Sequence, residues 1–119
     1  MIVEQVFDFL NNLKLYHWMT TNYARHKASD QCFESIQTLS DKFIEIYIGK
    51  YGRSKLVASS SSKVVIVRYT DSDIKELFSD FIDFLRKIKL DSKSDSDLLN
   101  IVDEMVGTLN QTLYLFTLK

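Results

Sequence analysis

Apolar side chains recur every three or four positions along most of this sequence, the spacing that places them on one face of an α-helix. Four such stretches, separated by polar or glycine-containing segments, predict helices over about 2–19, 22–49, 72–90 and 95–118. The most regular stripe belongs to the third stretch: Ile74, Leu77, Phe78, Phe81, Leu85 and Ile88. The pattern therefore predicts an all-α fold, with the whole chain forming a single four-helix bundle domain.

The segment 50–71 lacks this periodicity. It contains a run of serines over 59–62, followed by four consecutive β-branched residues from Val64 to Val67, which favour extended backbone. We expect part of it to form a short strand or to pack on a neighbouring element. A connection of this length can carry the chain from one end of a bundle to the other, whereas short connections join antiparallel neighbours. The expected fold is a ferritin-like four-helix bundle with a long crossover between the second and third helices. A simple up-and-down bundle with a loose loop is the alternative.

Composition narrows the classes of function. The chain has 15 basic and 16 acidic residues among 119, so its net charge of −1 gives no long-range attraction to nucleic acid, and strong nucleic-acid binding is not expected. A single cysteine, Cys32, excludes an internal disulfide and fits a reducing compartment. Polar residues interrupt the first apolar stretch, so no membrane span is expected there. We expect a cytoplasmic protein, located in the host cytoplasm or the virion if a virus encodes it.

Both histidines fall in a carboxylate-rich part of the sequence. At 100° per residue, His26, Asp30, Asp41 and Glu45 share a sector of about 100° on the second helix, on the side away from its apolar seam. With His17 on the first helix, they are the candidate metal ligands. One outward-facing row cannot enclose a metal, so a second copy is needed, and we expect at least a homodimer formed through the first two helices.

Imidazole and carboxylate ligands together suit iron(II), with zinc or manganese as alternatives. Other interpretations stay open at this point. A polar stripe on an amphipathic helix is more often a solvated face than a metal site. His17 also continues the apolar face of the first helix, so it can equally be a buried histidine that is satisfied by a backbone carbonyl.

The string Leu15-Tyr16-His17-Trp18, followed by the spaced residues of the second helix, resembles the ferroxidase signature of the miniferritins, the DNA-binding proteins from starved cells (Dps). Some stretches look more specifically like short, uncharacterised ferritin-like proteins of phages and large DNA viruses: Tyr16–Thr21, Tyr23–Ala28, Gly49–Gly52 and Leu98–Leu118. The resemblance implies an iron site between two subunits. One subunit would supply His17, His26 and Asp30, and its partner would supply Asp41 and Glu45.

The sequence also departs from that family. The histidines are nine residues apart, closer than in miniferritins, and no lysine-rich tail is present. Asp103 and Glu104 have no histidine three positions later, which disfavours a di-iron centre inside the bundle. The expected function is iron(II) oxidation and sequestration at a dimer-interface site, with no catalytic residue separate from the metal ligands. The alternative is a non-catalytic structural or protein-interaction bundle of viral origin that retains the fold.

Overall fold

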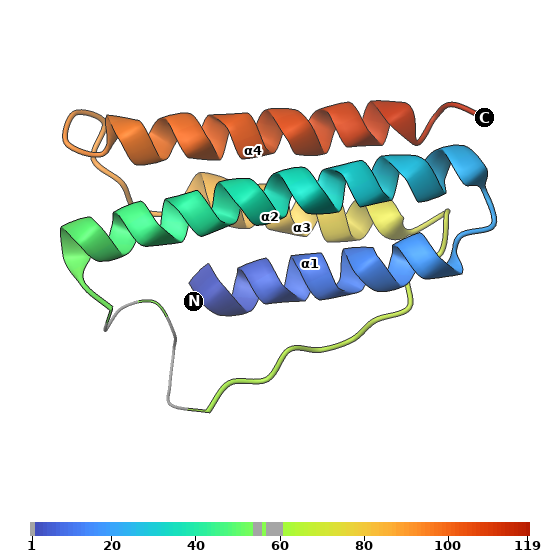
Figure 1. The fold of residues 1–119 in the computed structure, drawn as a ribbon, viewed down its shortest axis with the longest axis horizontal. Coiled ribbons are helices and arrows are strands. Elements are labelled where there is room, and N and C mark those ends of the chain that lie inside the picture. The colour runs from blue at the N-terminus through green and yellow to red at the C-terminus, as the bar shows by residue number, and fades with distance from the viewer. Residues whose placement is uncertain (1, 54–55, 57–60) are drawn as a thin grey trace.

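A computed structural model describes residues 2–53, 56 and 61–119 of the chain. It contains the helices α1 (Ile2–Met19), α2 (Tyr23–Tyr51), α3 (Ile74–Lys87) and α4 (Ser96–Leu115), and no strand occurs among the residues described (Figure 1). The prediction of an all-α fold with four helices is therefore confirmed.

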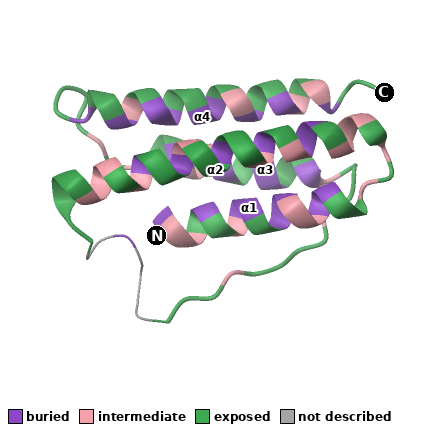
Figure 2. Ribbon diagram, in the orientation of Figure 1, coloured by how far each residue is buried: buried purple, intermediate pink, exposed green. Residues whose placement is uncertain are grey.

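The helices pack as a four-cornered bundle. Helix α1 packs on α2 and α3, and α4 packs on the same two helices, so that α1 and α4 occupy opposite corners. Helices α1 and α4 run in one direction and α2 and α3 in the other, which makes every packed pair antiparallel (Figure 1). The buried faces point inward (Figure 2). At the contact between α1 and α3, the ring of Phe9 stacks on Phe81 with centroids 4.5 Å apart and meets Phe78 edge-on.

Helix ends differ from the expected boundaries for local reasons. Helix α2 continues through Gly49, which adopts helical backbone, and ends only before Gly52, whose φ of 79° is favourable for a glycine alone. The backbone N–H of Gly52 donates to the carbonyl of Ile48 and caps the last turn. Helix α3 is shorter than the expected 72–90, because Ile88 takes extended backbone with ψ of 127°.

The described part of the crossover lies along α1, from its N-terminal to its C-terminal end (Figure 1). Ser62 donates to the Glu4 carboxylate near the start of α1, and Tyr16 near its end donates to Asp71. Between these points, the buried side chain of Asn12 donates to the Val65 carbonyl at 2.9 Å and accepts from the Val67 N–H at 2.7 Å. The β-branched run is therefore extended, as expected, but its partner is a side-chain amide rather than a strand.

At the other end of the bundle, α2 is clamped to the α3–α4 connection. The Lys50 ammonium donates to the Ser94 carbonyl, to Asp95 at 3.2 Å and to Asp97 at 2.6 Å. The Tyr51 hydroxyl also donates to Asp95, and this hydrogen bond is the main reason why the pKa of Asp95 lies below its ordinary value. The hydrogen bond from Lys50 lowers the pKa of Asp97 in the same way. These contacts give the Gly49–Gly52 stretch a structural role.

We predict that Lys50→Met lowers the midpoint of thermal unfolding by several degrees at neutral pH, and that this difference shrinks in acid. Asp95 and Asp97 have lowered pKa values in the folded state. Their contribution to the free energy of unfolding is therefore complete above pH 3.8, the ordinary carboxyl pKa, and is lost as the pH falls through the lowered pKa values. Thermal unfolding followed by circular dichroism between pH 7 and pH 2 measures this. Lys42→Met, at an exposed position of the same helix, is the matched control. A difference that stays constant down to pH 2 contradicts the prediction.

Candidate functional site

The two histidines form a reciprocal pair where α1 ends and α2 begins. Their rings stack with centroids 3.9 Å apart and an angle of 17° between planes. His17 Nδ1 lies 2.7 Å from the backbone carbonyl oxygen of His26, and His26 Nδ1 lies 2.9 Å from that of His17. The hydroxyl of buried Ser29 also lies 3.2 Å from His17 Nδ1. Each histidine thus fixes the orientation of the other.

These contacts determine where the ring protons lie. A carbonyl oxygen only accepts hydrogen bonds, so Nδ1 of each ring must carry a proton. In the neutral imidazoles, both Nε2 atoms then hold a lone pair, the tautomer found in histidines that bind a metal through Nε2 while Nδ1–H donates to a carbonyl. His17 is indeed buried and satisfied by a backbone carbonyl, the alternative considered from the sequence. That bond occupies Nδ1 and leaves Nε2 available.

A carboxylate lies beside this pair. Asp30 Oδ1 is 3.9 Å from His17 Nε2, and Lys14 Nζ on α1 donates to the same oxygen at 3.2 Å. The hydrogen bond from Lys14 is the main reason why the pKa of Asp30 lies below its ordinary value, so Asp30 is a carboxylate at neutral pH. Lys14 also lies 4.5 Å above the centre of the Phe33 ring. Sequence reasoning missed Lys14, although its position one helical turn before His17 is a signal that it shares that face.

The other two candidate ligands lie farther along α2. Asp41 and Glu45 are exposed, and Asp41 is about 16 Å from Asp30 along the helix axis at 1.5 Å per residue. One copy of the chain therefore brings together His17, His26 and Asp30 but neither Asp41 nor Glu45. Within the described residues, no group of three or more histidine, cysteine or acidic side chains is arranged to hold a metal ion.

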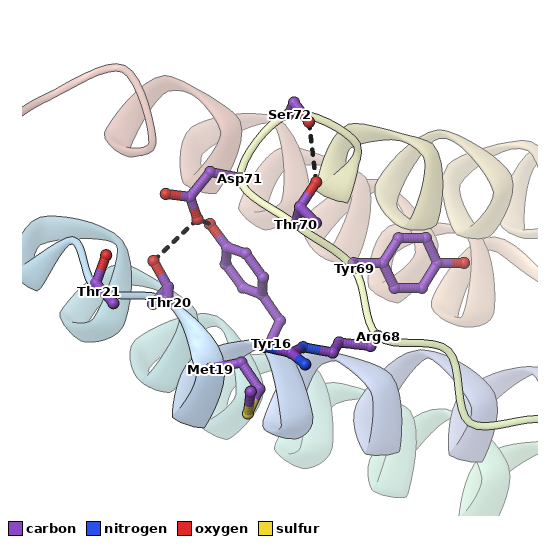
Figure 3. A pocket seen from close by; sticks show the side chains of 9 residues that line it. All are labelled: Tyr16, Met19, Thr20, Thr21, Arg68, Tyr69, Thr70, Asp71 and Ser72. Carbon is purple, nitrogen blue, oxygen red and sulfur yellow. Dashed lines mark hydrogen bonds between the residues drawn. The ribbon is translucent and has the colours of Figure 1, made fainter.

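A cavity of about 360 Å³ lies at the same end of the bundle, between the end of α1 and the crossover (Figure 3). Asp71 accepts hydrogen bonds there from the Tyr16 hydroxyl at 2.7 Å and from Thr20 at 2.9 Å, and Arg25 donates to the Tyr16 oxygen at 2.9 Å. Burial raises the pKa of Tyr16, so its phenol stays protonated. Sequence reasoning did not identify this network. Because its polar groups are bonded to one another, its evident role is to hold the end of the crossover against α1.

Large apolar side chains are exposed around the histidine pair and along the crossover. Trp18, next to His17, is 67% exposed, and Phe7 on the same face of α1 is 52% exposed. Exposed aromatic side chains that gather on one face commonly mark a contact surface. In the part of the chain that the structure describes, no helix has the length and apolar composition needed to cross a membrane.

The fold and site define an all-helical protein with a paired-histidine motif, and comparison with known proteins identifies its family. Residues 17–116 match the family of unknown function DUF5856, and the chain belongs to this family. One relative is an uncharacterised 14.6 kDa protein from the mobD–ri intergenic region of enterobacteria phage T4. It is 32% identical over 110 residues, which cover 87% of this chain and 75% of the relative. No solved structure matches the chain. Neither match is named as a ferritin or a miniferritin, so that resemblance stays a prediction.

Proposed function

We propose that the protein binds iron(II) and oxidises it at a site shared by two copies of the chain, in a bundle of the ferritin-like type. The observation that carries the proposal is the reciprocal pairing of His17 and His26, which leaves both Nε2 atoms free of the carbonyl bonds and holds the Nε2 of His17 3.9 Å from the Asp30 carboxylate. Two imidazoles and carboxylates are a ligand set that suits iron(II). The helix directions and the long crossover along α1 support the ferritin-like topology.

The spacing of the acidic residues supports completion of the site by a second copy. His26 and Asp30 are four positions apart, and so are Asp41 and Glu45. If α2 packs antiparallel on α2 of the partner, centred between residues 35 and 36, His26 lies level with Glu45 of the partner subunit. The same pairing places Asp30 level with Asp41 of the partner subunit. Each copy then contributes its histidines and Asp30 to one site, and Asp41 and Glu45 to the other, which is the reciprocity that a two-fold axis requires.

Apolar residues between these groups support burial of the face. Phe33, Ile44 and Ile48 are only half-buried within one chain, and they lie in the same outward sector of α2 as the candidate ligands. A second copy would remove them from water.

In the proposed reaction each iron(II) gives up one electron, and two such electrons with two protons convert one peroxide molecule to two waters. Zinc or manganese are alternative metals for the same ligands. The phage relative supports a viral origin and a place in the host cytoplasm.

The test is an anaerobic iron(II) titration followed by the fluorescence of Trp18, the single tryptophan, with the oligomeric state measured by sedimentation. We expect stoichiometric binding by a dimer or larger assembly, and iron(III) formation above the rate of a protein-free control when peroxide is added. Glu45→Gln should weaken binding, whereas Glu104→Gln, an exposed glutamate on α4, should not. A monomer, or equal binding by the two variants, would overturn the proposal. A stable assembly without iron binding would favour the structural or interaction protein instead.

A further inference from the structure

The crossover carries an unusually apolar exposed segment. Val65, Ile66 and Val67 are 65%, 59% and 41% exposed, and they belong to the part of the crossover that runs drawn out along α1 (Figure 1). Apolar β-branched residues in a row favour strand pairing, and an exposed strand of this kind is normally covered or interrupted by charges.

Only one edge of this segment is occupied. Asn12 bonds to the Val65 carbonyl and the Val67 N–H, the two groups that a neighbouring parallel strand would use. Successive residues of an extended chain direct their backbone groups to opposite sides, so those of Val64, Ile66 and Arg68 point away from α1. Within the described residues, no hydrogen bond reaches the backbone groups of these three. Asn12 thus holds the segment as a half-paired strand with its outer edge open.

We propose that two copies of the chain pair through this open edge to form a two-stranded antiparallel ribbon, with Ile66 opposite Ile66 of the partner subunit. Exposed strand edges bind other strands by adding to the ladder of backbone hydrogen bonds. This contact goes beyond the proposed iron site and does not depend on it.

The pattern of free backbone groups and side chains along the open edge fits a second copy of the chain in this register. Because only even-numbered residues offer outward backbone groups, each hydrogen-bonded pair must join even-numbered residues of the two copies, and a symmetric pairing centred on Ile66 meets this condition. Val65 then lies opposite Val67 of the partner subunit, so apolar side chains meet on both faces of the ribbon. Lys63 lies opposite Tyr69 of the partner subunit rather than opposite Arg68, which avoids a like-charge pair. The segment is therefore complementary to itself in hydrogen bonds, apolar contact and charge.

This contact lies apart from the histidine face. On α1, Asn12 points about 140° away from His17 and about 160° away from Lys14, the residues that contact α2. The ribbon and the α2 face are thus on opposite sides of α1. A chain with two different two-fold contacts builds an assembly larger than a dimer, such as a symmetric tetramer or a closed shell.

Cysteine cross-linking tests the register. Two residues opposite each other in a hydrogen-bonded antiparallel pair have Cα atoms about 5.5 Å apart, within the range that a disulfide bridges. Ile66→Cys should therefore form a covalent dimer under mild oxidation. Val65→Cys is the matched control, because the two copies of residue 65 would be about 8 Å apart in this register. The native Cys32 should not interfere, since burial leaves it 2% exposed and raises its pKa to about 11.

We expect at least about tenfold more covalent dimer from Ile66→Cys than from Val65→Cys, judged from the distance that a disulfide tolerates. Equal yields from the two variants, or no dimer from either, would overturn the proposal. Sedimentation of Ile66→Pro gives a second measurement. This substitution removes one outward N–H and leaves both Asn12 hydrogen bonds in place, so it should reduce the size of the assembly without changing iron(II) binding. An unchanged assembly would also count against the ribbon.

Discussion

The His26→Ala variant is expected to bind iron(II) at least about tenfold more weakly than the unaltered protein, because loss of even an outer-shell partner of a metal ligand typically costs 10- to 100-fold in affinity. The substitution removes one Nε2 lone pair. It also removes the Nδ1–H that donates to the His17 carbonyl and the ring that stacks on His17. The measurement is the anaerobic titration followed by Trp18 fluorescence.

His26→Asn separates ligation from folding. The Nδ2 of asparagine takes nearly the place of histidine Nδ1 and can still donate to the His17 carbonyl, but the shorter side chain supplies no Nε2. We expect this variant to unfold at a temperature close to that of the unaltered protein and to bind iron(II) as weakly as His26→Ala. Iron binding at the unaltered affinity would show that His26 is a structural residue of the α1–α2 turn.

The helices were predictable because each depends on its own apolar spacing. The core confirms this for α3, where Ile74, Leu77 and Phe78 are all buried as the stripe requires. The ends of the helices were less predictable. Gly49 and Gly52 are both acceptable helix ends by composition, and only the backbone shows that the positive φ falls at Gly52.

The path of the crossover was not predictable, because it depends on a residue far away in the sequence. Asn12 is 53 positions from Val65, and on a helix made of apolar and polar residues one asparagine carries no signal that it is buried. In the candidate site, too, the sequence pattern predicted one part of the arrangement and not the other. The pattern brought His17 and His26 into one set, whereas their reciprocal bonds depend on how the short α1–α2 turn closes.

The Asn12→Ala variant is expected to lower the free energy of unfolding by about 1–3 kcal/mol, the usual cost of leaving partly buried polar groups without partners. The side chain is 1% exposed and bonds to the Asp8 carbonyl as well as to the crossover. Alanine would leave the Val65 carbonyl and the Val67 N–H unpaired at the surface of α1, and would free the segment from α1. Urea unfolding followed by circular dichroism measures the change.

Asn11→Ala is the control for this prediction, since Asn11 is exposed on the same helix and should change stability by less than about 0.5 kcal/mol. Equal stabilities of the two variants would contradict the anchoring role of Asn12.

The Asn12→Ala substitution also connects folding with assembly. If Asn12 holds Val65 and Val67 so that the outer edge faces a second copy, then combining Asn12→Ala with Ile66→Cys should reduce the yield of covalent dimer. A full yield would mean that the edge pairs without its anchor, and that the strand conformation belongs to the β-branched run itself.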